Sequence, residues 1–408
     1  MDQSKKLLSF GITGTVSPAT PLNRNPTYLL SIHDVQKLLV ETAQEPKTRK
    51  AIQEALSDAD VSLEDLAKSG LLKQAGEHYR ISFVLFLKED LKTIKSVTGD
   101  LAHDLAQAYL QQRGEFSSLL ARSTNLNNAI DALAYILIGC FSLDWDGLQI
   151  TSELGYRTES QPTDLGDHYL TWAEERQNEA VRALYWGSHN DYFPECVLTS
   201  FGDHCALPRT TFPDLAWRME HSLYDLNISS EVEYRLVQAF SPFVSDFAEL
   251  IGELMLSLAE GDRSLEDLAE SLGEEPGEIL VKVDLLKSLN WVEGNTTSGY
   301  RPAIPAIPLS DKDLVEEVLT QSGKILMQWL PEHIDELKDR LSDITPHKYG
   351  LTFEETFTQV WHYLFGLTNK HLVKAGFFAD PYSPDRQFQG FIPAVWHPDV
   401  IPEETTFT

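Results

Sequence analysis

One stretch of this chain, from Ser264 to Arg301, contains a complete series of local folding signals. Ser264 followed by Asp267 is typical of a capping box, in which the serine oxygen accepts a backbone N–H and the acidic residue lies in the positive first turn. Apolar residues then recur on one face as far as Gly273, which favours the left-handed conformation that ends many helices. Pro276 predicts the start of a second helix, because the first helical position needs no N–H donor.

A β-hairpin is predicted after this second helix. Asn290 to Val292 favours a strand, Asn295 to Gly299 is rich in turn-forming residues, and Tyr300-Arg301 begins the returning strand. This order resembles the winged helix-turn-helix fold that is common in bacterial regulators. The resemblance covers roughly a tenth of the chain and implies a fold that binds either DNA or other proteins.

Part of the pattern recurs earlier in the chain. The hexapeptide from Ser62 to Ala67 is identical to that from Ser264 to Ala269, and Tyr79-Arg80 corresponds to Tyr300-Arg301. Long amphipathic helices are predicted after both copies at nearly equal intervals, so we expect an internal repeat. The alternative is that the hexapeptide is a common helix-forming sequence. The first copy also departs from the pattern, because it has no room for a separate helix between the hexapeptide and its strand.

The predicted fold is therefore mainly α-helical with small β wings. It has two winged-helix-like units with long helical extensions and an irregular, aromatic-rich connector between them. A chain of 408 residues is long enough for about two or three domains. The predicted parts are residues 1–150 for the first unit and its extension, 151–230 for the connector, 231–378 for the second unit and its extension, and 379–408 for an irregular tail.

The formal net charge of −29 makes the surface unfavourable for phosphate backbones and anionic lipids, unless basic residues are segregated. They are partly segregated, because residues 37–95 contain ten Lys or Arg and ten Asp or Glu, and the rest of the chain carries the whole net charge. Any contact with nucleic acid is therefore expected in the N-terminal part. The alternative is that the acidic surface serves only solubility.

The sequence is expected to be cytoplasmic and not to enter the membrane. Its N-terminus lacks the features of a signal peptide, and its longest apolar run, Ala132 to Phe141, is too short to cross a bilayer. Three cysteines are too few for a disulfide framework, which fits a reducing compartment.

Residues 231–258 predict a long amphipathic helix ahead of the second unit. Its apolar residues alternate steps of three and four, as in a coiled-coil seam, at Val237, Phe240, Val244, Phe247, Ile251, Leu254 and Leu258. Ser241-Pro242 is a candidate helix start within this segment. Such a helix either packs inside its own domain or forms a dimer interface.

The two units differ in the residues that they offer to DNA. A recognition helix normally presents Arg, Lys, Asn or Gln to base edges. The corresponding helix of the second unit carries Glu278 and Asp284 in an acidic stretch, and it is a poor DNA surface. The first unit is the better candidate, and the residues predicted there to bind DNA are Lys47, Arg49, Lys50, Lys68, Lys73 and Arg80.

The aromatic-rich segment from Gly155 to Leu226 contains a second candidate site. Its residue types are those that bind zinc or form a thiol-imidazole pair, and the predicted ligands are His189, Cys196, His204 and Cys205. The spacing matches no CxxC, HExxH or phosphate-binding glycine loop. The alternative is a structured connector in which aromatic residues pack and the Asp and His side chains cap turns.

These patterns favour a non-enzymatic regulatory or assembly protein that acts mainly through protein-protein contacts in a DNA-linked process. A protein partner or a homodimer is expected, and no cofactor is predicted. A transcriptional regulator that binds DNA through the first unit is the second hypothesis. An enzyme or zinc site that uses the Cys, His and Asp residues of positions 189–221 is the third, and it requires those side chains to meet in one pocket.

Overall fold

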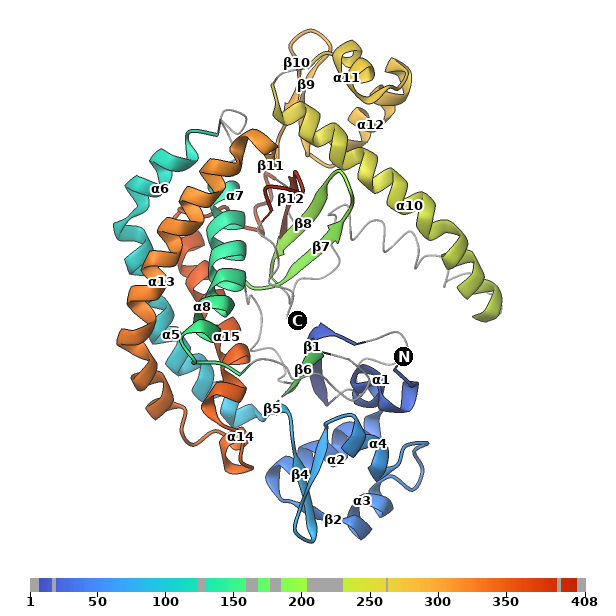
Figure 1. The fold of residues 1–408 in the computed structure, drawn as a ribbon, viewed down its shortest axis with the longest axis vertical. Helices are drawn as coiled ribbons and strands as arrows, with labels where there is room; N and C mark the ends of the chain where they lie inside the picture. The colour runs from blue at the N-terminus through green and yellow to red at the C-terminus, as the bar shows by residue number, and fades with distance from the viewer. Residues whose placement is uncertain are drawn as a thin grey trace.

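The computed structural model describes residues 7–16, 20–123, 130–158, 168–176, 185–203, 230–261, 263–386 and 390–401. This part of the chain is mainly helical and includes four small sheets. Long helices form a layer along one side of the molecule, and two small units lie at its opposite ends (Figure 1).

The N-terminal unit, residues 33–81, combines three short helices with a three-stranded sheet of order β2-β4-β3. It is preceded by β1 (Leu8–Thr15), the 3-10 turn η2 (Leu22–Arg24) and α1 (Pro26–Ser31). Its elements are α2 (His33–Gln44), β2 (Lys47–Thr48), α3 (Arg49–Ala55), α4 (Leu63–Lys68), β3 (Leu72–Ala75) and β4 (His78–Ile81).

The C-terminal unit, residues 230–302, repeats this order of elements. Arg263 forms an isolated bridge to Tyr300, where the N-terminal unit has the strand β2. The elements are α10 (Ser230–Ala259), α11 (Leu265–Leu272), α12 (Pro276–Ser288), β9 (Val292–Asn295) and β10 (Gly299–Pro302). The predicted helix stop is confirmed, because Gly273 is left-handed with a φ of 67°.

The two Tyr-Arg pairs occupy equivalent places in the two sheets. Tyr79 lies in the central strand, between Lys47 of β2 and Gln74 of β3. Tyr300 lies in the same way between Arg263 and Gly294.

The identical hexapeptides occupy different places. Both begin with a capping box, made by Ser62 with Asp65 and by Ser264 with Asp267. The first hexapeptide forms α4, the helix that leads directly into the hairpin, whereas the second forms α11, which is followed by α12. The first copy has no second helix after its hexapeptide, but it has α3 before the hexapeptide, so both units contain two helices between the first helix and the hairpin.

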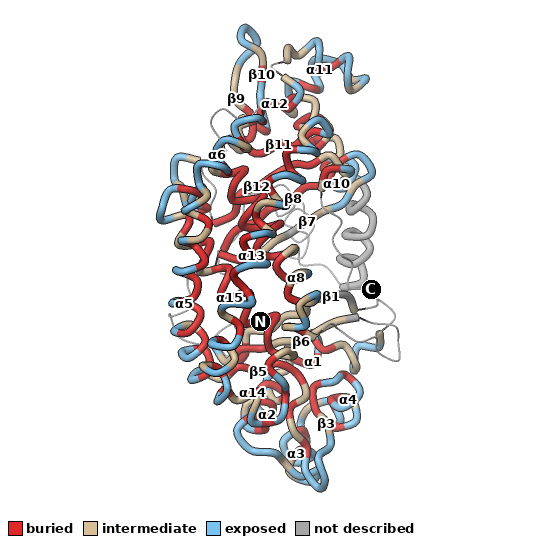
Figure 2. The backbone as a smooth tube through the Cα atoms, turned by 60° about the vertical axis from the view of Figure 1, so that its left-hand side comes forward, coloured by how far each residue is buried: buried red, intermediate tan, exposed pale blue. Residues whose placement is uncertain are grey.

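The helical layer joins the two halves of the chain. Helix α5 packs on α15 and α13, and α13 also packs on the π-helix η3. Every residue of η3 from Tyr135 to Asp144 is buried, because this run is apolar except at Ser142 and Asp144 and has no continuous polar face for water. The layer consists of α5 (Lys88–Gln111), α6 (Arg113–Leu120), α7 (Ile130–Ala134), η3 (Tyr135–Asp146), α8 (Gly147–Glu153), α13 (Lys312–Arg340), α14 (Thr345–Lys348) and α15 (Phe353–Lys374), with the 3-10 turn η5 (Leu309–Asp311) before α13. Figure 2 shows that buried positions are concentrated in this layer and in the neighbouring sheet.

Each half also contributes a sheet beside the helical layer. The first has the order β1-β6-β5, with β5 (Val84–Phe86) parallel to β6 (His168–Glu175). The second has the order β11-β12-β8-β7. Strand β11 (Ala306–Ile307) is parallel to β12 (Phe391–Trp396). Strand β8 (Val197–Gly202) is antiparallel to β12 on one side and to β7 (Ser188–Tyr192) on the other. Val84 pairs with Trp172 in the first sheet, and Ala306 pairs with Val395 in the second. The sequence separations of these two parallel pairs differ by one residue.

Two segments that we expected to be irregular contain strands instead. The described part of the connector, 151–230, includes β6, β7 and β8, and the expected tail, 379–408, includes β12. All residues of β8 and β12 are buried, so these strands lack the alternation that reveals a half-exposed strand. The candidate helix start at Ser241-Pro242 is also wrong, because α10 continues through these residues.

Candidate functional site

The basic residues predicted to bind DNA all lie in the N-terminal unit, on β2, α3, α4, β3 and β4. The structure therefore brings them into one unit, but it also neutralises several of them. Three form ion pairs with glutamates: Lys47 with Glu45 at 3.8 Å, Arg49 with Glu64 at 2.8 Å and Lys50 with Glu54 at 3.7 Å.

The other three basic residues divide into two kinds. Arg80 is half-buried, and its Nη1 donates to the carbonyl oxygen of Tyr349 at 2.8 Å, so it connects the N-terminal unit to the segment before α15. Lys68, at the end of α4, and Lys73, on β3, have no ion pair within the described part of the chain. Two lysines on one unit are a weak basis for binding a phosphate backbone.

Helix α12 of the C-terminal unit presents an apolar and acidic surface. Val281 is 71% exposed, Leu280 is 37% exposed and Leu285 is 36% exposed, with Glu278 and Asp284 exposed beside them. We call these five residues the α12 face. They lie on the side of the helix opposite Ile279, Val283 and Leu286, which are buried in the unit.

Both lysines of α12 are turned away from this face. Lys282 forms an ion pair with Glu274, and both side chains are mostly buried. The Lys287 ammonium lies 5.6 Å from the centre of the Tyr300 ring, where the negative face of the aromatic ring attracts it. No basic side chain of α12 therefore remains on the side that a recognition helix would present to DNA.

The predicted zinc ligands lie only partly within the described residues. Cys196 is fully buried against α10, where its Sγ lies 3.6 Å from the carbonyl oxygen of Glu249. Burial, reinforced by the charges of Glu249, Glu253 and Glu195, raises the pKa of the thiol to about 12. Because zinc binds the thiolate, a metal ion at Cys196 would have to displace this proton.

Of the remaining predicted ligands, the structure describes only His189. His189 lies on β7, where its backbone pairs with Ser200, and His204 and Cys205 lie outside the described residues. Within the ranges that the structure describes, no group of three or more His, Cys, Asp and Glu side chains is arranged to hold a metal ion.

The buried carboxylate of Glu174 serves packing between elements rather than an open site. It accepts hydrogen bonds from Gln359 Nε2 at 2.9 Å and from the Tyr363 hydroxyl at 2.7 Å. Burial raises its pKa although both hydrogen bonds oppose the shift. These contacts connect β6 of the first half to α15 of the second half.

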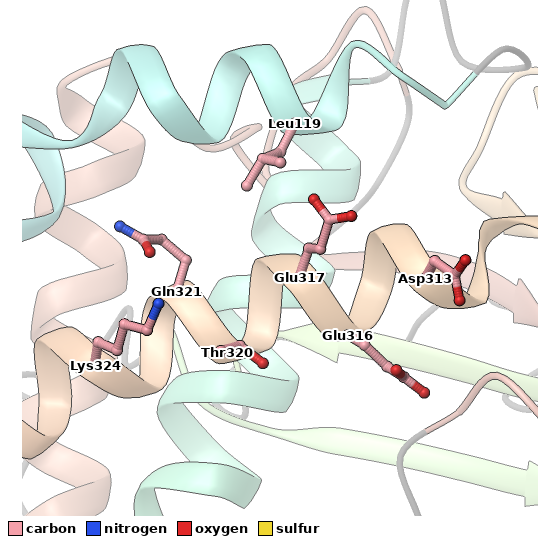
Figure 3. A pocket seen from close by; sticks show the side chains of 7 residues that line it. All are labelled: Leu119, Asp313, Glu316, Glu317, Thr320, Gln321 and Lys324. Atoms are coloured by element: carbon pink, nitrogen blue, oxygen red, sulfur yellow. The ribbon is translucent and has the colours of Figure 1, made fainter.

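A groove of about 550 Å³ lies between α6 and α13. Figure 3 shows Leu119 above α13 and a row of polar side chains along that helix. Three of the lining residues are acidic, Asp313, Glu316 and Glu317, against the single cation Lys324. This lining is unfavourable for nucleic acid, like the α12 face.

Comparison with known proteins found no match: no family model matches the chain, and neither a curated protein nor a solved structure is similar to it. Among the described residues, no helix is both long and apolar enough to cross a membrane.

Sequence reasoning identified the acidic residues of the α12 face but missed its apolar residues. Leu280, Val281 and Leu285 are ordinary core residues of an amphipathic helix when they are read along the chain. The signal for their exposure was available, since Ile279, Val283 and Leu286 already form a buried face of helical period. Three further apolar residues on the other side exceed what one buried face needs.

Proposed function

We propose that this chain is a non-enzymatic regulatory or assembly protein in a DNA-linked process, built on two winged-helix units that bind other proteins. The order of elements and of sheet strands in both units supports the winged-helix assignment. The observation that carries the function is the α12 face, which presents Leu280, Val281 and Leu285 where a DNA-reading helix would present basic residues.

We also propose that the two halves descend from one duplicated unit. The equivalent positions of Tyr79 and Tyr300 support this, as do the two parallel strand pairs that close after nearly equal intervals. Duplication would leave one unit to bind a partner while the other diverged.

The chemistry of the α12 face defines its partner as a protein segment with an apolar side bordered by Lys or Arg. Exposed leucine and valine side chains favour burial against an apolar surface. Glu278 and Asp284 flank them, and Ser264 to Arg301 contains eight Asp or Glu against three Lys or Arg. Opposite charge on the partner would steer its approach and specify its orientation.

Direct binding of DNA through the N-terminal unit is the second candidate function. It rests on Lys68 and Lys73, the two predicted residues with neither an ion pair nor a side-chain hydrogen bond to another described residue. Residues 33–81 contain nine Asp or Glu and seven Lys or Arg, so even this unit has a negative formal charge. The geometry therefore supports protein binding better.

The proposal can be tested with a labelled synthetic helix that has leucines on one side and lysines along both borders. We expect the full chain to raise its fluorescence anisotropy in a saturable manner. The double variant Val281→Lys/Leu285→Lys should weaken binding at least about tenfold, which corresponds to about 1.4 kcal/mol. Both positions are exposed, so this variant should remain folded.

The matched control is the double variant Leu309→Lys/Met327→Lys. It makes the same change of charge at two apolar side chains that are 49% and 46% exposed elsewhere on the surface. It should bind the peptide within about twofold of the unchanged protein. Equal losses in the two double variants would show that the peptide responds only to net charge, and would overturn the α12 site.

A second arm measures binding to a labelled DNA duplex at low and at physiological salt. We expect no saturable binding at either. Binding that falls steeply with salt, and that disappears in Lys68→Glu/Lys73→Glu, would replace the proposal with the transcriptional-regulator hypothesis.

A further inference from the structure

The N-terminal end of the molecule exposes apolar side chains beside cations. Among the described leucines, Leu22 on η2 is the most exposed, at 62%, and Tyr28 on α1 is 36% exposed. Arg24 is the last residue of η2, and Lys68 is exposed at the end of α4. We call these four residues the Leu22 patch.

The three elements that carry the Leu22 patch pack on one another. Turn η2 contacts both α1, which follows it directly, and α4. A hydrogen bond fixes the second contact, because Asn23 Nδ2 donates to Asp65 Oδ1 at 2.8 Å. Lys68 lies three residues beyond Asp65, and therefore on the same side of α4. The fold thus brings the apolar and the cationic residues to one surface.

The charges that this patch offers to a partner are positive. Neither Arg24 nor Lys68 forms an ion pair within the described part of the chain. The neighbouring carboxylates of α4 are already engaged, because Glu64 is paired with Arg49 at 2.8 Å and Asp65 caps the start of the helix. Two cations therefore remain beside exposed apolar side chains, in a chain whose formal net charge is −29.

The α12 face has the complementary composition. It exposes Leu280, Val281 and Leu285, and its charged members are the carboxylates of Glu278 and Asp284. Apolar side chains on both surfaces favour burial of one against the other, and cations that meet carboxylates orient the contact. The Leu22 patch therefore has the chemistry that the α12 face requires of a partner, an apolar surface bordered by Lys or Arg.

The two surfaces can meet only between different copies of the chain. The α12 face and the Leu22 patch lie at opposite ends of the molecule (Figure 1). One copy therefore cannot join its own two surfaces, whereas two copies can. A contact between unlike surfaces is heterologous, and it continues from copy to copy until it closes into a ring or grows as a filament.

We propose that the partner of the α12 face is a second copy of this chain, which binds through its Leu22 patch in a head-to-tail contact. This inference rests on the protein-binding function proposed for the α12 face, and it names the partner of that face.

Self-association of the full chain is the first measurement. We expect its mass in sedimentation equilibrium to rise with concentration, up to roughly 0.3 mM. Val281→Lys/Leu285→Lys blocks one side of the contact and should weaken association at least about tenfold. Leu22→Glu/Lys68→Glu blocks the other side and should have an effect of the same size. All four positions are exposed, so both variants should remain folded. An unchanged chain that stays monomeric throughout this range would overturn the proposal.

The matched control for the N-terminal variant is Leu309→Glu/Lys348→Glu. It makes the same substitutions at a leucine that is 49% exposed and at an exposed lysine, both outside the two surfaces. It should associate within about twofold of the unchanged protein. The same loss in this control as in Leu22→Glu/Lys68→Glu would show an effect of net charge alone and would overturn the assignment of the patch.

Mixing the two blocked variants tests the head-to-tail geometry. Each variant retains one of the two surfaces, so each should be monomeric alone, and an equimolar mixture should form a dimer that does not grow further. If the contact instead joined two α12 faces, Leu22→Glu/Lys68→Glu would still associate with itself. That result would contradict the proposal, as would a mixture that stays monomeric.

The labelled synthetic helix distinguishes a failure of this inference from a failure of the function on which it rests. If a second copy binds the α12 face, the helix should compete for that face and dissociate the assembly. A chain that binds the helix but stays monomeric would overturn the second copy as the partner and leave the α12 site in place. A chain that does neither would overturn both.

Discussion

Asp146, the last residue of the π-helix η3, should limit the stability of the helical layer above neutral pH. Burial raises the pKa of its carboxyl group to about 7 from an ordinary value of 3.8. No hydrogen bond or ion pair to another described residue compensates the carboxylate for this burial. The charged form is therefore less favourable in the folded protein than in the unfolded chain.

The expected effect follows from the size and sign of this shift. A pKa shift of roughly three units, at 1.36 kcal/mol per unit, sets an upper limit of about 4 kcal/mol on the destabilisation that the charged Asp146 carboxylate causes. The side chain keeps some contact with water, so we expect about 2 kcal/mol for Asp146→Asn, which removes the charge. Because the pKa is raised in the folded state, the stability that the protonated group contributes is complete below about pH 4 and is lost as the pH rises through about 7.

Urea denaturation at about pH 4.5 and about pH 8 measures this difference. Asp146→Asn should raise the free energy of unfolding at the higher pH and change it little at the lower pH. The control Asp284→Asn makes the same substitution at an exposed site and should stay within about 0.5 kcal/mol of the unchanged protein at both. The reasoning is refuted if Asp146→Asn destabilises the protein at the higher pH, or stabilises it equally at both.

Three further predictions concern buried contacts. Gly252→Ala should destabilise the protein by about 2–4 kcal/mol in thermal or urea unfolding, because the new Cβ would overlap Sγ of Cys196, and adding Cys196→Ala should restore most of the loss. Cys196 should resist iodoacetamide at pH 8 in the folded protein, because the thiol is buried and its pKa is raised, and it should react after denaturation. Peptide mass spectrometry measures the alkylation. Rapid alkylation of the native protein would contradict this prediction. Arg80→Ala should lower the free energy of unfolding by about 1–3 kcal/mol, because it removes the hydrogen bond to the Tyr349 carbonyl oxygen. Hydrogen exchange should show faster exchange at the contact between the N-terminal unit and the segment before α15. An effect confined to nucleic-acid binding would show that Arg80 has a different role.

Local signals predicted helix starts well, because a capping box depends on residues only three positions apart. The box of Ser264 with Asp267 is present as expected, and α12 begins at Pro276. Helix interiors were harder. Ser241-Pro242 was a candidate helix start, yet α10 continues through these residues.

Strands in the middle and C-terminal parts were missed for a physical reason. The residues of β12 face protein on both sides, so they show no alternation, and Pro393 argues against a central strand. Its partners, β8 and β11, are separated from it by long stretches of sequence, and only the closed sheet identifies them.

The candidate sites likewise combine residue types that the sequence shows with exposure and contacts that only the fold determines. The acidic character of α12 is readable in its residues, but the exposure of Val281 depends on which side of the helix packs against its unit. The contact of Arg113 with Phe377 was not foreseen, because these residues meet only when α6 packs beside the end of α15. Among the expected zinc ligands, Cys196 is buried against α10, and this burial, which the sequence does not show, raises the pKa of its thiol.

By itself, the sequence determined the net charge of −29, the mainly helical class and the local order of helices and hairpin around Ser264, because each of these depends on composition or on neighbours within a few residues. Only the tertiary structure decided that Arg49 is paired with Glu64, that Arg80 contacts the Tyr349 carbonyl oxygen, and that α12 shows an apolar face to solvent. Pairing and exposure depend on contacts between segments that are far apart in the chain, and those contacts exist only after the elements have packed.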